Sequence, residues 1–383
     1  MFLQNILSDN LLFGAFLILL ACFIIQMAYY WGIFSKLAFY NKKIVPEKNY
    51  PVSVVICAKN EYSNLKKNLP LILEQEYANF EVVLVNDCSD DDSHYLLKNM
   101  SEQYPHLSVV TIKQNVNFFS GKKFALAVGI KSAKHDLVLL TDADCTPKSK
   151  RWIFEMQKNF SDKNQIILGY SGYEKRKGFL NQLIRFDTIY TAIQYLSWSL
   201  SGMTYMGVGR NLAYNKELFF KNKGFTSHYQ IPSGDDDLLI NQIAKNNNAC
   251  IEISHESQTF SAPKTSYSDW FRQKKRHYST SNLYKLKHKI MLGLFPFSNL
   301  LFYATLVFMM VFFIKASFYN DIIFIGSLYV LKTASMMFIF KKCMNRLDEK
   351  NLLLISPVMD IIFLVINPLI AFSNYLVHEN KWK

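Results

Sequence analysis

Four long apolar segments, one near the start of the chain and three near its end, constrain its fold more than any other feature. Residues 11–31 are almost purely apolar and match the roughly 20 residues that a membrane-spanning helix requires. The other segments are 293–314, 322–340 and 352–374. Two prolines and an aspartate interrupt the last one, so a re-entrant or interfacial hairpin stays open there. The chain is therefore expected to be an integral membrane protein with a large region between its anchors.

The distribution of lysines predicts the side of the membrane on which the middle region lies. Lys36, Lys42, Lys43 and Lys48 follow the first apolar segment, whereas Asp9 is the charge that precedes it. Because cationic flanks stay in the cytoplasm, the middle region is expected to be cytoplasmic. The same rule, together with attraction to anionic lipid, accounts for the net charge of +13. Since no nucleic-acid-binding motif accompanies this charge, we expect membrane lipid and no nucleic acid among the partners.

Between residues 51 and 262, short β-rich apolar runs alternate with helical ones. This alternation is typical of an α/β domain with a mostly parallel sheet and covering helices. The expected strands are 52–57, 81–85, 108–112 and 137–141, and the expected helices are 65–74, 93–101 and 122–132. The predicted domains are an N-terminal transmembrane anchor (1–40), the α/β domain (41–262), a basic amphipathic interfacial segment (263–292) and a C-terminal transmembrane region (293–383).

Two carboxylates stand at the end of one predicted strand. The apolar run 138–141 leads directly into Asp142 and Asp144. Ligands of open α/β sheets gather at the carboxyl ends of the strands, and paired carboxylates suit a hard divalent cation. A solvated turn is the alternative for an isolated Asp-x-Asp sequence. Polar clusters also follow two other strands, at 58–61 and 86–90, and this grouping favours a cation site beside a diphosphate.

Five short motifs follow one another in order along this region. They are PVSVVICAKNE at 51–61, VNDCSD at 85–90, GKKFAL at 121–126, TDAD at 141–144 and GRNLAY at 209–214. This ordered set resembles the family 2 glycosyltransferases, which have a GT-A catalytic domain, in their membrane-anchored form. The family usually has proline where Cys57 stands. The set as a whole is far more specific than any one of its members.

The resemblance implies that a nucleotide-sugar donor binds at the strand ends together with a divalent metal, Mg or Mn. Such a cation neutralises the charge that develops on the leaving diphosphate. The implied metal ligands are Asp144 and Asp142, the latter through water or as a ribose contact. Further donor contacts are implied at Ala58, Glu61, Asp87, Lys122 and Arg276. An ordinary surface lysine is the alternative for Lys122, and an interfacial cation is the alternative for Arg276.

An inverting transfer also needs a base for the acceptor hydroxyl, and a carboxylate is the usual solution. Residues 233–240 read SGDDDLLI and resemble the family's Glu-Asp-x-x-Leu motif. One alignment makes Asp235 the base and places Gly234 where glutamate is common. The other makes Asp236 the base, and both stay open. Acids at a helix N-terminus also complement the helix dipole, a structural role that does not exclude catalysis.

Acceptor-side contacts are implied at Arg210, Asn211 and Gln273. Gln273 opens the sequence QKKRH, which looks like the Gln-x-x-Arg-Trp motif of processive polysaccharide synthases with His277 in the tryptophan position. The surrounding segment 263–292 mixes aromatic and cationic side chains, as is typical of a helix at a membrane surface.

The resemblance thus implies an inverting glycosyltransferase that moves a sugar from a nucleotide-sugar donor, a UDP-sugar in this interpretation, to a lipid-linked or glycan acceptor at a bacterial inner membrane. A processive polysaccharide synthase is the alternative, disfavoured by His277 and by the few C-terminal spans. A non-catalytic membrane scaffold or nucleotide-sugar sensor with a GT-A domain is the alternative of another class. The acids at 87, 142, 144 and 235–236 argue against such decay.

Overall fold

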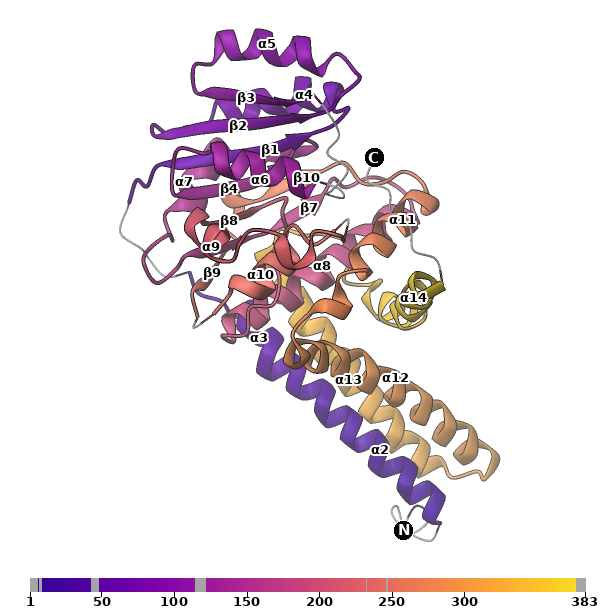
Figure 1. Ribbon diagram of the computed structural model, residues 1–383. Coiled ribbons are helices and arrows are strands. Elements are labelled where there is room, and N and C mark those ends of the chain that lie inside the picture. Colours follow the sequence, from indigo (N-terminus) through magenta and orange to yellow (C-terminus); the bar gives the residue numbers. More distant parts are fainter. Residues whose placement is uncertain are drawn as a thin grey trace. The chain divides into compact units, whose positions relative to one another are not determined.

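A seven-stranded sheet is the centre of the region between the anchors (Figure 1). The computed structural model describes residues 6, 9–42, 48–113, 122–231, 233–245 and 247–376. By its contacts the chain divides into two units. One comprises Met1–Tyr40 and Lys285–Leu369, and the other comprises Asn41–Tyr284 and Ile370–Lys383.

The central sheet of the second unit has the strand order β3-β2-β1-β4-β8-β6-β9. Its strands are β1 (Val52–Ala58), β2 (Phe80–Asp87), β3 (Leu107–Ile112), β4 (Leu137–Asp142), β6 (Ile166–Gly169), β8 (Leu212–Asn215) and β9 (Ala249–Glu252). The first four of these run parallel, and β8 is antiparallel to both of its neighbours. The prediction of a mostly parallel sheet is therefore confirmed.

Burial explains why the first strands are continuous apolar runs. Every residue of β1 is buried, which is expected when helices cover both faces of a parallel sheet. The covering helices of this part are α4 (Tyr62–Leu73), α5 (Ser93–Gln103), α6 (Lys123–Ser132) and α7 (Trp152–Gln157). Cys57 pairs with Asp142 and Ala58 with Asn86, so the polar ends of β1, β2 and β4 meet at one edge of the sheet.

The unit also contains a small second sheet. It consists of β5 (Cys145–Pro147), β7 (Ser171–Tyr173) and β10 (Thr259–Ser261), with β10 in the middle. Ser261 pairs with both Cys145 and Tyr173, which brings three distant parts of the chain together directly after Asp144. The other helical elements of the unit are α8 (Phe179–Leu200), α9 (Lys216–Lys221), η2 (Thr226–His228), α10 (Asp237–Ile243), η3 (His255–Ser257), α11 (Tyr267–Tyr278) and η4 (Ser281–Leu283).

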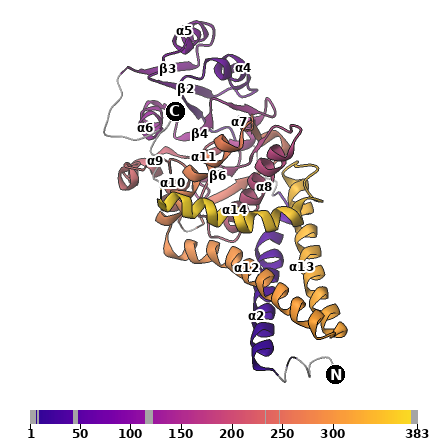
Figure 2. The same cartoon turned by 90° about the vertical axis from the view of Figure 1, so that its right-hand side faces the viewer.

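The first unit contains the helices that are long and apolar enough to cross a membrane. They are α2 (Asn10–Met27), continued by a π-helical stretch (Ala28–Phe34) and α3 (Ser35–Ala38), then α12 (Leu286–Lys315), α13 (Tyr319–Arg346) and α14 (Ser356–Leu376). The prediction of one N-terminal and three C-terminal apolar helices is thus confirmed. Within this unit α14 runs across α12 and α13 instead of alongside them (Figure 2).

Polar side chains inside this helical unit bond to one another. Lys332 is fully buried, and its ammonium lies 2.9 Å from an Asp360 carboxylate oxygen. Asn299 and Tyr303 donate to the same carboxylate, each at 2.9 Å. Because unpaired charges in an apolar medium are costly, this arrangement accounts for how α14 can contain an aspartate.

The segment predicted as basic, amphipathic and interfacial, 263–292, contains several helical elements in the structure. It contains α11, η4 and the first turns of α12, which begins at Leu286. The lysines near 285–289 gave no sequence signal that α12 begins at Leu286, because lysine is equally compatible with a helix interior. One face of α11 is also buried in its own unit. Trp270 is 4% exposed, and Lys274 pairs with Asp187 of α8 at 2.7 Å.

Candidate active site

Lys122 lies between an acid of the sheet and an acid of the 235–237 cluster. It occupies the N-cap position of α6, and its ammonium contacts Asp142, the last residue of β4. The same nitrogen is 3.9 Å from an oxygen of Asp235. Burial opposes the charge of Lys122, but Asp142 and Asp235 outweigh it and raise the pKa of this lysine. Lys122 therefore stays cationic and joins two groups of predicted site residues that lie far apart in the sequence.

Asp142, Asp144 and Cys145 form a compact group of potential metal ligands. One ligand atom from each lies within 4.8 Å of the others. Burial raises the pKa of Cys145 to about 12, so it remains a thiol at neutral pH. Two carboxylates without a thiolate suit Mg²⁺ or Mn²⁺ better than a soft metal. The donor chemistry of Asp142 and Asp144 thus fits the predicted cation.

The two carboxylates of this group differ electrostatically. Burial acts to raise the pKa of Asp142, but Lys122 and two arginines, Arg210 and Arg276, lower it overall. The pKa of Asp144 is raised by burial and by the adjacent Asp142. Glu61 adds to this repulsion, and Arg210 offsets part of it. Asp144 is therefore the acid with uncompensated negative charge, which a divalent cation would stabilise.

Arg210 is a fixed cation beside these acids. Its guanidinium donates to the carbonyls of Ser171 and Gly172, at 3.1 and 3.2 Å, and to the Ser261 hydroxyl at 3.1 Å. It also lies over the ring of Tyr173, 4.4 Å from the centroid. Gln273 of α11 donates to the Tyr173 hydroxyl at 3.0 Å, so the predicted acceptor-side residues Arg210 and Gln273 meet on one tyrosine.

Asn211 lies apart from them, in the core. It is 0% exposed, and its amide donates to the carbonyls of Tyr170 and Ser257, both at 2.8 Å. Its oxygen accepts from the Trp152 indole at 3.0 Å. This asparagine directly before β8 bonds to Tyr170, Ser257 and Trp152 in the core, and the acceptor contact that the resemblance implies stays a prediction.

The three consecutive aspartates have three different surroundings. Both oxygens of Asp236 accept backbone N–H groups at 2.7 Å, one from Gly209 and one from Asp237. Asp237 is buried and accepts from Thr280 at 2.5 Å and from Tyr284 at 2.7 Å. Asp235 instead approaches Lys122, with its side chain 18% exposed. Burial and the neighbouring aspartates raise the pKa of Asp236 to about 7.

The remaining predicted donor contacts lie at the ends of β1 and β2. Ala58 is 1% exposed. Glu61 lines an open pocket of about 470 Å³ together with the acids at 90–92. Asp87 is half-buried at the end of β2, and burial raises its pKa while Lys59 lowers it. Arg276 is exposed on α11, and its charge acts on Asp142.

Two residues of the site had no individual role predicted from the sequence. Tyr173 supports Arg210, but Tyr173 lies in β7 and Arg210 in the turn before β8, and no local pattern joins them. Lys123 is 0% exposed and follows Lys122 directly. A signal for Lys123 did exist, because residues 123, 126 and 130 share one helix face and the latter two are apolar. A lysine on such a face is expected to be buried and bonded.

Comparisons with known proteins agree with this geometry. Residues 53–221 match the model of the family "Glycosyl transferase family 2". The chain is 27% identical over 153 residues to the probable glycosyltransferase YdaM of Bacillus subtilis, covering 39% of this chain and 35% of that protein. It is 27% identical over 128 residues to a poly-beta-1,6-N-acetyl-D-glucosamine synthase of Staphylococcus aureus, covering 31% and 30%. The matches thus span about a third of these relatives.

Among solved structures, the fold is similar to that of the mannosyltransferase PcManGT from Pyrobaculum calidifontis, in complex with GDP-Man and Mn²⁺. The TM-score is 0.56 at 18% identity, and the match covers 88% of this chain and 99% of that one. This likeness extends over both the sheet and the helices that flank it in the sequence.

Proposed function

We propose that this protein, in which residues 53–221 form a glycosyltransferase family 2 domain, transfers a sugar from a nucleotide-sugar donor to a lipid-linked or other membrane-proximal acceptor, with inversion at the anomeric carbon. One observation carries the proposal: Lys122 contacts Asp142 and lies 3.9 Å from Asp235. A donor-side acid and an acid suited to the acceptor therefore share one site. A transfer reaction needs this proximity, because both substrates must meet there.

The donor half of the site combines two carboxylates with three cations. Asp142 and Asp144 would hold Mg²⁺ or Mn²⁺, which when bound neutralises charge on the leaving diphosphate. Lys122, Arg210 and Arg276 all act on Asp142 and would orient the phosphates. Glu61 and Asp87, with the backbone at Ala58, would contact the nucleoside at the ends of β1 and β2. A UDP-sugar is the proposed donor.

In the acceptor half, we assign the base to Asp235 and not to Asp236. Both oxygens of Asp236 already accept backbone N–H groups, which suits a helix cap better than a proton acceptor. Asp235 is partly exposed and faces the donor side through Lys122. In the proposed step its carboxylate takes the proton of the acceptor hydroxyl. The hydroxyl oxygen bonds to the anomeric carbon as the bond from that carbon to the diphosphate oxygen breaks.

The proposed acceptor follows from the apolar helices and from α11. Four helices are long and apolar enough to cross a membrane. On α11, Tyr267 is 56% and Phe271 is 37% exposed, beside the exposed Arg272. Exposed aromatic and cationic side chains on one helix suit a lipid headgroup region. An acceptor carried by a lipid, on the cytoplasmic face of a bacterial inner membrane, is consistent with both features.

The test uses the purified full-length protein in detergent with Mn²⁺ and a panel of nucleotide sugars. Release of the nucleoside diphosphate is measured for the wild type and for Asp235→Asn, Asp236→Asn and the control Asp136→Asn, which alters an aspartate 82% exposed in its side chain. Loss of a general base costs about 10² to 10⁴-fold. We expect a loss of this size for Asp235→Asn with donor KM unchanged, and a smaller loss for Asp236→Asn.

Three outcomes would contradict parts of the proposal. An active Asp235→Asn beside an inactive, folded Asp236→Asn would reverse the assignment of the base. Wild-type protein that binds a nucleotide sugar but turns over none would favour a sensor. A product that carries many sugars on one acceptor would favour a processive synthase.

A further inference from the structure

Lys123 is a fully buried lysine next to the exposed end of the site. It occupies the first turn of α6 and is 0% exposed. Its ammonium donates to the carbonyl of His228 at 2.6 Å and to the carbonyl of Ile231 at 2.8 Å. Burying a lysine is costly unless its charge is compensated by hydrogen bonds and by nearby anions. Such a group in this position needs a specific explanation.

The anions that face Lys123 are those of the acid cluster. Burial lowers the pKa of Lys123 to about 8, and Asp235, Asp237 and Asp236 act against that decrease. The hydrogen bonds, however, go to backbone carbonyls of the loop that precedes the cluster. Lys123 therefore both holds this loop and places a positive charge close to the three aspartates.

A second side chain holds the other end of the same loop. The imidazole of His228 lies 3.0 Å from the Gly234 carbonyl through Nε2, and its Nδ1 lies 2.9 Å from the Ser227 hydroxyl. Burial and Lys123 lower the pKa of His228 to about 4, so the ring is neutral and can donate from Nε2 to this carbonyl. The backbone directly before Asp235 is thus fixed from both sides.

Gly234 completes the arrangement. Its φ is +99°, and a Cβ there would lie 2.5 Å from a carbon of Leu238. The turn into Asp235 therefore depends on glycine at this position.

We infer that Lys123 is a positioning residue that fixes the loop residues 228–231 and 233–235, so that Asp235 lies beside Lys122 and Asp142. The neighbouring lysines then divide the work at the start of one helix. Lys122 faces the donor-side acid, while Lys123 holds the loop that carries the acceptor-side acid. This inference rests on the proposed role of Asp235 as base for its catalytic consequence, but its structural content is independent of that role.

The first experiment needs no substrate. Amide hydrogen exchange of the full-length protein in detergent is compared for the wild type, Lys123→Met and Lys131→Met, which alters an exposed lysine of the same helix. We expect exchange of the amides at 226–231 and 233–235 to be about tenfold faster or more in Lys123→Met, because two buried hydrogen bonds are lost. Exchange in β1 and β4 should stay unchanged, and Lys131→Met should resemble the wild type.

The second experiment measures turnover on whichever of UDP-glucose, UDP-N-acetylglucosamine and GDP-mannose the wild type uses with Mn²⁺. Displacing a catalytic group by about 1 Å lowers the rate by about 100-fold. We therefore expect kcat to fall by about that factor in Lys123→Met, while the donor KM stays within twofold. Lys123→Gln retains two N–H donors without the charge, and we expect it to recover part of both kcat and loop protection. It also serves if the methionine variant does not fold.

The outcomes separate this inference from the proposed function. Unchanged exchange of the loop in a folded Lys123 variant overturns the inference, whatever the activity. Faster exchange in a protein that turns over no nucleotide sugar supports the positioning of the loop and refutes the proposed function. A parallel loss of donor affinity and stability across the whole unit, without selective exchange in the loop, assigns Lys123 a general structural role and overturns the inference.

Discussion

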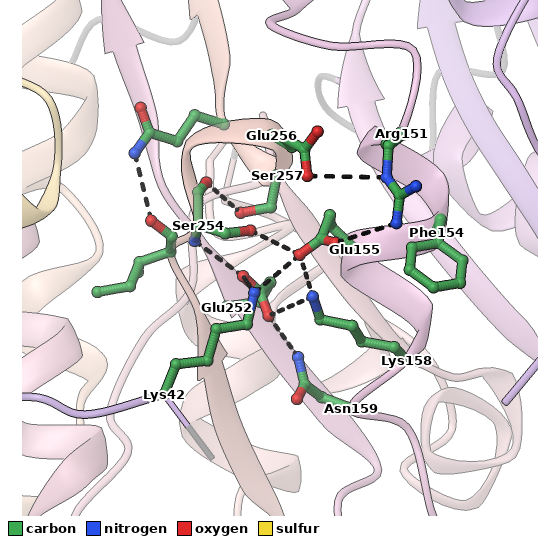
Figure 3. A network of polar contacts seen from close by, with 12 residues as sticks. Lys42, Arg151, Phe154, Glu155, Lys158, Asn159, Glu252, Ser254, Glu256 and Ser257 are labelled. Carbon is green, nitrogen blue, oxygen red and sulfur yellow. Dashed lines mark hydrogen bonds and ion pairs between the residues drawn. The ribbon is translucent and has the colours of Figure 1, made fainter. Parts of the chain in front are cut away.

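Two charged clusters in the same unit use carboxylates in opposite ways. Figure 3 shows the first, in which Glu155 of α7 and Glu252 of β9 are surrounded by donors. Glu155 accepts from Lys42 at 2.9 Å and from the Ser254 hydroxyl at 2.8 Å, and it also contacts Lys158. Although burial opposes ionisation, these donors lower the pKa of Glu155 to about 2. This cluster is complete without any ligand.

The cluster at the candidate active site is not balanced in this way. Asp144 faces Asp142 and Glu61, and burial together with these acids raises its pKa. Asp236 likewise has a raised pKa, about 7, because it is buried beside two other aspartates. The comparison teaches that burial alone does not distinguish a structural acid from a functional one. Between Glu155 and Asp144, the distinction lies in whether the protein itself supplies enough positive partners for the charge.

Removing Asp144 should have the largest effect on activity. Because the carboxylate is proposed to hold the divalent cation, Asp144→Asn should lower turnover by about 10³-fold, or about 4 kcal/mol in the barrier. At 100 times its Kd, Mn²⁺ should stabilise the wild type by about 2.7 kcal/mol and the variant by much less. Turnover and thermal unfolding with and without Mn²⁺ measure both effects. Retained turnover in Asp144→Asn would refute the metal assignment.

Removing Glu155 should affect stability instead of chemistry. Glu155→Gln leaves Lys42 and Lys158 short of a partner in a largely buried cluster, which should lower the free energy of unfolding by about 3 kcal/mol. The activity per folded molecule should stay unchanged. Glu256→Gln is the control, because the Arg151–Glu256 pair is exposed and should contribute under about 1 kcal/mol. A folded Glu155→Gln with greatly reduced kcat would contradict the conclusion that the Glu155 cluster contributes to stability and not to chemistry.

The sequence predicted much of this fold because its patterns are local. The strands expected at 52–57 and 137–141 are present as Val52–Ala58 and Leu137–Asp142, since a buried parallel strand is a continuous apolar run. Asp142 and Asp144 were found in the same way, at a strand end. The start of α12 at Leu286 was not found, because the flanking lysines do not interrupt a helix.

The parts of the site that escaped prediction depend on tertiary contacts. Arg210 contacts Tyr173 of β7 and Ser261 of β10, two residues that pair with each other in the second sheet. The distinction between Asp235 and Asp236 required knowing which oxygens already accept N–H groups. Asn211 matches the family motif in residue type, but it lies in the core, so the match alone did not establish a contact with the acceptor. Neighbours across the sheet are not encoded at any fixed sequence spacing.

The pH dependence of stability should also separate the two clusters, because their contributions have opposite signs. Folding lowers the pKa of Glu155 from 4.5 to about 2. Its contribution to the free energy of unfolding is therefore complete above pH 4.5 and is lost as the pH falls from 4.5 to about 2. For Asp236 the pKa rises from 3.8 to about 7 on folding, so stability decreases as pH rises between these values. Denaturant unfolding from pH 3 to 8 measures both effects. Glu155→Gln should weaken the loss of stability below pH 4.5, and Asp236→Asn should weaken the decrease in stability between pH 3.8 and about 7. If Asp236→Asn left the decline between pH 4 and 7 unchanged, Asp236 would be ionised in the folded protein, and the contrast would have to rest on Asp144 alone.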